Sequence, residues 1–226
     1  MKSTETRQGW KHKTTLLRKD EEKKEDVSKE DKRNILDILG LQATVASSQD
    51  INKIKELMGP NAHQLKKAYK IINTSTQDVY NRYMTDVEDD KIELFWHGSR
   101  NENWLNIIST GLLIRPSGAV YSGSMFGDGI YFADKAQKSI GYSSLRGSHW
   151  TRGTANKGFL ALFSVHVGKQ KHIKRWQREH SSLSYDKVRS EGCDSVFAHG
   201  GADLRNNEYI VYKSRQCTIS YLIEIG

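Results

Sequence analysis

Cysteine is scarce in this sequence, and the spacing expected of metal ligands is missing. Only Cys193 and Cys217 occur among 226 residues, which excludes a scaffold built on several disulfides. No C-x-x-C pair is present and the eight histidines follow no ligand spacing, so we expect no metal site. The sequence also has no recognisable zinc finger or repeat that would recruit a partner.

Long apolar runs are missing as well. The N-terminus has no apolar stretch ahead of a cleavage site, which argues against secretion. No segment reaches the roughly 18 consecutive apolar residues that a membrane span requires. We therefore expect an intracellular protein, cytoplasmic or nuclear, with no membrane partner.

Positive charge, by contrast, is in excess. There are 35 Lys and Arg against 27 Asp and Glu, with a net charge of +8. This favours acidic partners, such as phosphates or nucleic acid, without choosing between them. The densest basic stretch is GKQKHIKRWQREH at 168–180, which surrounds Trp176. Such a stretch is typical of a nucleic-acid surface or of a solvated loop, and both interpretations stay open.

The composition changes twice along the chain. Residues 1–32 are rich in charge and poor in hydrophobic side chains, which predicts a flexible tail. Residues 33–90 are predicted to form a helical N-terminal segment, with the acidic DVEDD at 86–90 as its boundary. Two apolar stripes at helical spacing carry this prediction: Ile51, Ile54, Leu57 and Met58, then Leu65, Ala68, Tyr69 and Ile72. Ser48 or Asp50 is the candidate N-cap of the first helix, and Asn61 that of the second.

Residues 91–226 change to short strands separated by glycine. IELFWHGS at 92–99 alternates in polarity and predicts a strand that leaves His97 at its end. Further strands are predicted within GIYFAD, FLALFSVHVG, EYIVY and TISYLIEI. Short helices are expected from Asn101 to Gly111 and, capped by Asp134, up to Ile140. The connections are too short for regular βαβ crossovers, so we expect mostly antiparallel pairing in an α+β fold.

Two familiar phosphate-binding patterns can be excluded among the glycines. GAVYSGS from Gly118 has the glycine spacing of a Walker A loop, but Ser124 stands in place of the lysine. GDGIYF has Phe132 where a dinucleotide fingerprint requires its third glycine.

The stretch MFGDGIYFADKAQKSIGY at 125–142 predicts a slot for a flat ligand. Tyr131 on a strand and Tyr142 just after the following helix can form opposite walls. Ser139 adds a hydroxyl and Gly98 an unobstructed backbone donor and acceptor. An amide on an aromatic ring, such as nicotinamide, needs partners of this kind.

Three motifs resemble the catalytic domain of the poly(ADP-ribose) polymerases, a family with the ADP-ribosyltransferase fold. They are FWHGSR at 95–100, the 125–142 stretch, and NNEYIVY at 206–212, and they supply His, Tyr and Glu in the family's order. The resemblance covers roughly residues 91–226. It implies a mostly antiparallel, split β-sheet with short helices, preceded by the small helical segment.

The resemblance further implies that NAD is the substrate and that nicotinamide is released as ADP-ribose passes to an acceptor. Glu208 would bind the nicotinamide ribose and stabilise the positive charge that develops as the glycosidic bond breaks. His97 and Ser99 would hold the adenosine ribose. The implied site residues are His97, Gly98, Ser99, Arg115, Tyr131, Lys138, Ser139 and Tyr142 for NAD, with Met125 and Glu208 on the acceptor side.

Each of these residues also has an ordinary explanation when taken alone. A histidine at a strand end is most often structural, and Tyr131 and Tyr142 could be core aromatics. Taken alone, Lys138 is interpreted as a surface lysine. Only their joint occurrence favours an enzyme. Two alternatives of another class stay open: a non-catalytic module that binds NAD or ADP-ribose, and a nucleic-acid-binding protein.

The most detailed prediction concerns the product, which is either a chain of ADP-ribose units or a single unit. The set of His97, Tyr131 and Glu208, with Met125 at the acceptor side, favours short polymers on a protein acceptor, including the chain itself. Ser124 and the short connection between Gly168 and Glu208 oppose it and favour a single ADP-ribose. Leu113 replaces an arginine of many relatives, and Arg115, expected on the same strand face, could take its place.

Overall fold

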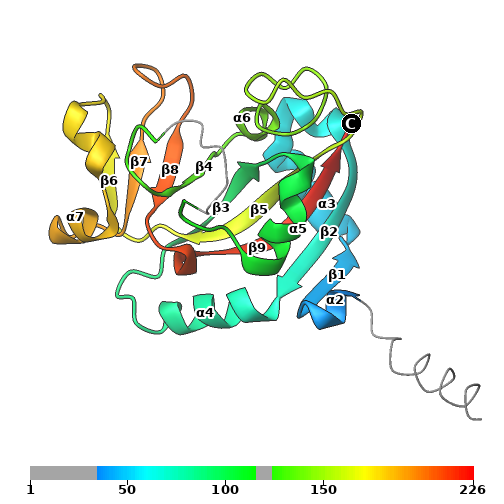
Figure 1. The fold of residues 1–226 in the computed structure, drawn as a ribbon, viewed down its shortest axis with the longest axis horizontal. Helices are drawn as coiled ribbons and strands as arrows, with labels where there is room; N and C mark the ends of the chain where they lie inside the picture. Colours follow the sequence, from blue (N-terminus) through cyan, green and yellow to red (C-terminus); the bar gives the residue numbers. More distant parts are fainter. Residues whose placement is uncertain (1–34, 116–123) are drawn as a thin grey trace, which may run out of the picture. The chain divides into compact units, whose positions relative to one another are not determined.

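The computed structural model describes residues 35–115 and 124–226. The flexible tail predicted for residues 1–32 lies outside these residues. By its internal contacts the chain divides after Ile38. The described residues before this point form the short helix α2 (Ile35–Ile38), and the other elements belong to the unit Leu39–Gly226 (Figure 1).

This second unit contains two β-sheets. The first has five antiparallel strands in the order β1-β2-β9-β5-β3, and the second has four in the order β4-β8-β7-β6. The first sheet is built from β1 (Leu41–Val45), β2 (Leu65–Asn73), β9 (Cys217–Ile225), β5 (Gly158–His166) and β3 (Ile92–Gly98). The second is built from β4 (Ile130–Phe132), β8 (Glu208–Val211), β7 (Ser195–Ala198) and β6 (Gln170–Ile173). Only β6 and β7 pair in parallel among the described strands, so the predicted antiparallel α+β fold is confirmed.

Short helices connect and cover the strands. The α-helices are α3 (Ser48–Met58), α4 (Thr74–Met84), α5 (Trp104–Thr110), α6 (Ala136–Ile140) and α7 (Tyr185–Ser190). Single 3-10 turns are η1 (Gly59–Gln64), η2 (Asn101–Asn103), η3 (Arg178–Ser182) and η4 (Ser214–Gln216). No helix among residues 35–115 and 124–226 is both long enough and apolar enough to cross a membrane.

The first predicted helix of the N-terminal segment is confirmed as α3, but its cap is Ser47 and not Ser48 or Asp50. Ser47 Oγ accepts the amide of Asp50 at 3.1 Å, and the Asp50 carboxylate accepts the amide of Ser47 at 3.3 Å. Asp50 is therefore the third helical residue of a reciprocal capping box.

The second predicted helix is wrong. Residues Leu65–Asn73 form β2, which pairs with β1 on one side and β9 on the other. A register shift between Leu65 and Lys67 interrupts the period-2 alternation, and the remaining apolar spacing imitates a helix. Asn61 consequently lies in a 3-10 turn and caps no helix.

The helix caps predicted after residue 90 are also partly wrong. Asn101 opens the turn η2, and α5 begins three residues later, at Trp104, without a side-chain cap. Asp134 does not cap α6 but accepts a hydrogen bond from Asn207. The stop at Gly111 is confirmed, because this residue ends α5 with φ of +77°, where only glycine is unstrained.

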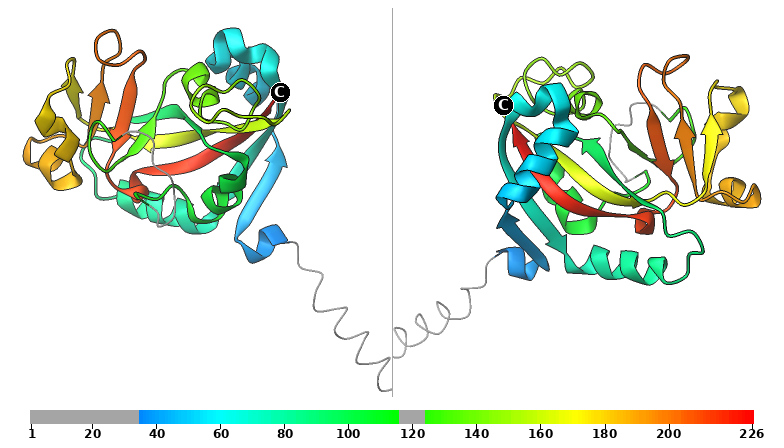
Figure 2. Two further views of the ribbon diagram at one scale, coloured as in Figure 1. Left: turned by 45° about the horizontal axis from the view of Figure 1, so that its top comes forward. Right: turned by 180° about the vertical axis from the view of Figure 1, so that it is seen from behind.

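The central strands β5 and β9 of the five-stranded sheet are buried on both faces. Figure 1 shows α5 in front of β5 and β9, and the view from behind in Figure 2 shows α3 on the opposite side. The side chains agree, because Trp104 of α5 packs with Phe163 whereas Ile54 of α3 packs with Leu162. Burying each of these large apolar side chains contributes about 1.5–3 kcal/mol. β3 therefore presents Phe95 and His97 to the α5 face, and Trp96 to the α3 face.

Candidate functional site

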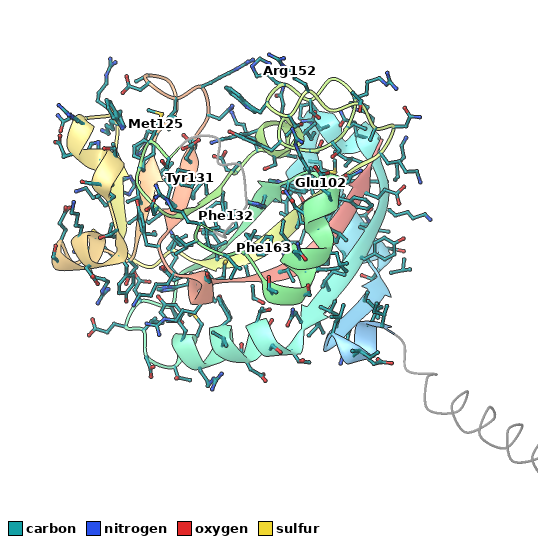
Figure 3. All side chains as sticks on the ribbon, viewed as in Figure 1. Glu102, Met125, Tyr131, Phe132, Arg152 and Phe163 are labelled. Atoms are coloured by element: carbon teal, nitrogen blue, oxygen red, sulfur yellow. The ribbon has the colours of Figure 1, made fainter. Side chains whose placement is uncertain are left out.

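The site lies where the two sheets meet. β3 is an edge strand of the first sheet and β4 an edge strand of the second. The two edges are joined by a single bridge, in which the amide of Trp96 donates to the carbonyl of Ala133 at 2.8 Å and the amide of Ala133 donates back at 3.0 Å. Figure 3 shows Tyr131, Phe132 and Phe163 in this region.

His97 contacts the second sheet across this junction. Its Nδ1 lies 3.2 Å from the carbonyl oxygen of Tyr131. Because a carbonyl can only accept, Nδ1 must carry the hydrogen, and Nε2 of the neutral ring is then an acceptor. The ring meets Phe132 and Phe163 edge-on, both with centroids 6.0 Å away. Backbone and aromatic contacts thus fix both the orientation and the tautomer of His97.

The charge state of His97 follows from the same surroundings. Burial lowers the pKa of His97 to about 4, and the hydrogen bond to the Tyr131 carbonyl only partly opposes this. The ring is therefore neutral at physiological pH. It can accept a hydrogen bond from a hydroxyl but cannot serve as a cation.

Gly98 and Ser139 are brought into direct contact by the packing of α6 against β3. A Cβ atom on Gly98 would lie 2.0 Å from the carbonyl oxygen of Ser139, so no side chain fits there. Ser139 is 3% exposed, and its Oγ has no hydrogen-bond partner among residues 35–115 and 124–226. This hydroxyl is not among the fully buried unpaired atoms, so it stays accessible to a ligand or to water.

The two predicted wall residues, Tyr131 and Tyr142, both lie in the electrostatic field of Glu208. Burial is the main cause that raises the pKa of each phenol, and the charge of Glu208 raises both further. Tyr131 is fixed, since its hydroxyl donates to the carbonyl of Gly127 at 2.7 Å. Tyr142 stacks on Trp150 with centroids 6.0 Å apart and planes 19° from parallel. That the two rings enclose one slot stays a prediction.

Glu208 is held by Lys138. Lys138 Nζ lies 2.5 Å from Glu208 Oε1 and 3.2 Å from the carbonyl oxygen of Asn207, and both side chains of the ion pair are only 14% exposed. The interpretation of Lys138 as a surface lysine is therefore wrong. The second oxygen, Oε2, has no partner among the described residues, so one side of the carboxylate stays open to a ligand.

A second support for Glu208 was not predicted from the sequence. Asn207 Nδ2 donates to Asp134 Oδ2 at 2.7 Å, and Asn207 Oδ1 accepts the amide of Gly200 at 2.9 Å. These bonds hold the start of β8 against the residues that follow β4. Asn207 stands directly before Glu208 in the quoted NNEYIVY motif, and this adjacency was the only signal available in the sequence.

Two other predicted NAD contacts lie in turns. Ser99 Oγ accepts a hydrogen bond from Asn103 Nδ2 at 2.9 Å. Arg115 is not on a strand, contrary to expectation, but has a left-handed φ of +48° and pairs with Asp128, Nε to Oδ1, at 2.5 Å. No hydrogen bond or ion pair links Arg115 to His97 or Ser99 within the described residues, so its role at the adenosine side stays a prediction.

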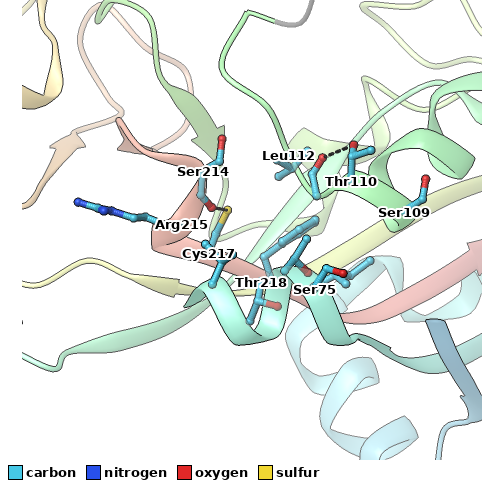
Figure 4. Close-up of a pocket in the computed structure, with 13 residues that line it drawn as sticks. Ser75, Ser109, Thr110, Leu112, Ser214, Arg215, Cys217 and Thr218 are labelled. Carbon is cyan, nitrogen blue, oxygen red and sulfur yellow. Dashed lines mark hydrogen bonds between the residues drawn. The ribbon is translucent and has the colours of Figure 1, made fainter. Parts of the chain in front are cut away.

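A pocket of about 260 Å³ lies elsewhere on the α5 face of the first sheet (Figure 4). α4, the end of α5, η4 and β9 surround it, and Phe163, whose ring edge meets His97, lines it too. Its lining includes Cys217, a buried free thiol whose pKa is raised to about 12 by burial. None of the predicted NAD contacts lines this pocket.

No group of three or more His, Cys, Asp or Glu side chains that could hold a metal ion occurs in the part of the chain that the structure describes.

Comparison with known proteins gives the class to which this arrangement belongs. Residues 48–226 match the family model described as "Poly(ADP-ribose) polymerase catalytic domain". The class is that of the NAD⁺ ADP-ribosyltransferases, which use NAD as their substrate. The chain belongs to the poly(ADP-ribose) polymerase catalytic-domain family, as its motifs predicted. The match begins within the segment predicted as a separate helical region, and that domain division stays a prediction.

Several curated relatives are similar to the chain. "Putative poly [ADP-ribose] polymerase-like 100L" of Invertebrate iridescent virus 6 is 32% identical over 162 residues, covering 70% of this chain and 84% of the viral protein. "Poly [ADP-ribose] polymerase 2" of Homo sapiens is 32% identical over 157 residues, which is 58% of this chain and 26% of the human protein. "Poly [ADP-ribose] polymerase 1" of Danio rerio is 33% identical over 172 residues, 69% of this chain and 17% of that protein. The chain thus spans most of the viral relative but only a minor part of the two vertebrate ones.

Proposed function

We propose that this chain cleaves the bond between nicotinamide and ribose in NAD and transfers the ADP-ribose to a protein acceptor. The observation that carries the proposal is the Glu208 carboxylate at the junction of the sheets, with Oε1 bound by Lys138 and Oε2 open. A single fixed carboxylate beside a binding slot is what this reaction needs.

The nicotinamide end of NAD binds in the slot formed by Gly98, Tyr131, Ser139 and Tyr142. The free Ser139 Oγ and the backbone of Gly98 serve the carboxamide, which both donates and accepts hydrogen bonds. The glycine is required because α6 leaves no space for a Cβ atom. The tyrosine rings contact the two faces of the nicotinamide.

The ribose at the adenosine end binds His97. The neutral ring accepts a hydrogen bond from a ribose hydroxyl at Nε2, because Nδ1 is already used by the Tyr131 carbonyl. Ser99, two residues further along, lies beside it. Arg115 completes this end of the NAD site.

Glu208 stabilises the transition state. As the C–N bond breaks, its electron pair moves to the nicotinamide nitrogen, which loses its positive charge and leaves as a neutral group without protonation. The ribose carbon gains oxocarbenium character, and the open Oε2 of Glu208 stabilises that charge. The acceptor oxygen then bonds to this carbon, and its proton passes to Glu208 or to solvent. Lys138 fixes the carboxylate from the opposite side.

Short polymers are the proposed product. The His97, Tyr131 and Glu208 set with Met125 at the acceptor side supports chain growth, because a ribose hydroxyl of the growing chain needs a carboxylate beside it. Ser124 and the short connection from Gly168 to Glu208 support the second candidate, a single ADP-ribose.

Incubation of the pure chain with labelled NAD, followed by mass spectrometry, tests the proposal. We expect released nicotinamide and adducts of more than one ADP-ribose unit on the chain itself. Adducts of a single unit would support the second candidate. Binding of NAD without any release of nicotinamide would contradict the transfer activity and indicate a non-catalytic binding module.

A further inference from the structure

An exposed tryptophan lies among basic side chains between β6 and η3. Trp176 is 38% exposed, and no aromatic ring or cation of the described residues stacks on it. Tryptophan is enriched at interfaces, so an exposed indole with an uncovered face is a candidate contact for a partner.

Trp176 is held rigidly in this exposed position. Its indole Nε1 donates to the carbonyl oxygen of Met125 at 2.8 Å, and its backbone amide donates to Asp203 Oδ2 at 2.7 Å. The indole N–H is therefore directed at the Met125 carbonyl, and this bond orients the ring before any partner binds. A fixed ring loses little conformational freedom on binding.

The two partners of Trp176 come from the loops that precede the proposed chemistry. Met125 leads into β4, which carries Tyr131, and Asp203 lies in the loop that leads into Glu208. Trp176 is thus attached to both loops at the proposed acceptor side. This position has functional meaning only if the proposed transfer activity is correct.

Four basic side chains in the same segments are free of ion pairs. Lys174, Arg175, Arg178 and Arg205 are exposed, and none pairs with an acidic group in the described part of the chain. Nearby cations behave differently: Lys171 pairs with Glu191 and Arg189 with Asp194. We name the free set, together with Trp176, the Trp176 surface.

We propose that the Trp176 surface binds single-stranded nucleic acid, with a base stacked on Trp176 and phosphates bound by the four cations. Every base has a flat face that can stack on an indole, and successive phosphates need cations on either side of it. An acidic peptide would use the cations but would have no need of an oriented indole. The combination therefore favours nucleic acid.

Fluorescence anisotropy with a labelled oligothymidylate of about 12 nucleotides tests the proposal in the full chain without NAD. Trp176→Ala should weaken binding by about 5- to 100-fold, because base stacking is lost. Trp176→Phe should retain most of the affinity, since a ring remains although the bond to Met125 is lost. If the tryptophan served only to order the loop, both variants would lose affinity equally, and this result would overturn the proposal.

The salt dependence tests the four cations. The logarithm of the binding constant should fall with the logarithm of salt concentration with a slope of about −3, and each Lys or Arg changed to Ala should make the slope shallower by about 0.7. Lys53→Ala, on the exposed side of α3, is the charge-matched control and should leave the slope unchanged. An equal effect of this control would show unspecific attraction and overturn the proposal.

Competition distinguishes the kinds of partner. Unlabelled oligothymidylate should displace the probe, whereas a polyglutamate peptide of equal charge should compete at least tenfold less well. Equal competition by the peptide would assign the surface to an acidic protein instead. Because binding is read without NAD, a chain that binds the oligonucleotide but releases no nicotinamide would contradict the proposed activity and leave this inference standing.

Discussion

The two sheets contribute to the site by different physical means. The five-stranded sheet has central strands that are buried on both faces, and its edge strand β3 positions His97 and Gly98 through apolar packing and close backbone contact. The four-stranded sheet has strands of three or four residues, and it positions Glu208 through an ion pair and the hydrogen bonds of Asn207. Under the proposed function, the first sheet contributes His97 and Gly98 to NAD binding, while the second contributes Tyr131 to binding and the charge of Glu208 to the chemistry.

A substitution at the contact between β3 and α6 should disturb the binding edge of the first sheet most strongly. Gly98→Ala would place a Cβ atom 2.0 Å from the Ser139 carbonyl, which neither backbone can avoid without moving. We expect a loss of about 3 kcal/mol or more in the free energy of unfolding, and NAD binding weaker by more than tenfold. Urea denaturation and calorimetry measure the two effects. As a control, Gly147→Ala has open space around its Cβ, so it would report only the strain of its φ of +87°. Normal NAD affinity in Gly98→Ala would contradict the close-contact account.

The partly buried, neutral His97 makes the stability of the folded chain depend on pH. Its pKa of about 4 in the folded chain is below the unfolded value of about 6.5, so protons bind preferentially to the unfolded chain. The contribution of His97 is complete above pH 6.5 and is lost as pH falls toward 4, amounting to roughly 3 kcal/mol. His97→Gln should remove this part of the pH dependence between pH 6.5 and 4. An unchanged profile would show that other groups cause it.

The hydrogen bonds that support the Glu208 carboxylate can be weakened without changing His97 or Gly98. Asn207→Ala removes the bonds to Asp134 and to the amide of Gly200. We expect turnover to fall about tenfold while the dissociation constant of NAD changes less than threefold, because Glu208 loses its position but the slot remains. Asn206→Ala, at the preceding residue, is the matched control. Equal losses of turnover in both variants would assign the effect to the loop as a whole.

The smallest effect is expected at the free hydroxyl of the slot. Ser139→Ala removes one hydrogen bond to the carboxamide, worth about 1 kcal/mol, and should raise the Michaelis constant for NAD about fivefold. The inhibition constant of benzamide should rise by the same factor, since one slot serves both ligands. Benzamide inhibition that is unaffected by this change would refute the shared slot.

Local sequence patterns predicted the positions of His97 and Gly98 better than the contacts of the charged groups. The alternation within IELFWHGS and its glycine placed His97 and Gly98 correctly at the end of β3, because the period-2 pattern of a strand can be recognised from local sequence. β2 was missed because its register shift hides the alternation, and its identity depends on two partner strands.

The charged groups depend on contacts that no local pattern records. Lys138 and Glu208 are 70 residues apart in sequence, and Asp134 and Asn207 are 73 apart. Asp134 is of a residue type that often caps helices, and Lys138 is of a type that usually lies on the surface. These pairings depend on the fold, so local patterns could not predict them, although the family resemblance had named Glu208 and Lys138 as site residues.

The claim that the second sheet carries the chemistry depends most directly on Glu208. Glu208→Gln keeps the shape of the side chain but removes the charge that we propose stabilises the transition state. Calorimetric binding of NAD and single-turnover release of nicotinamide should be measured on the same preparation. We predict a dissociation constant within a few-fold of the unmodified chain and a turnover lower by about a hundredfold or more. Unchanged turnover, or a loss of binding as large as the loss of turnover, would contradict the assignment of chemistry to the second sheet.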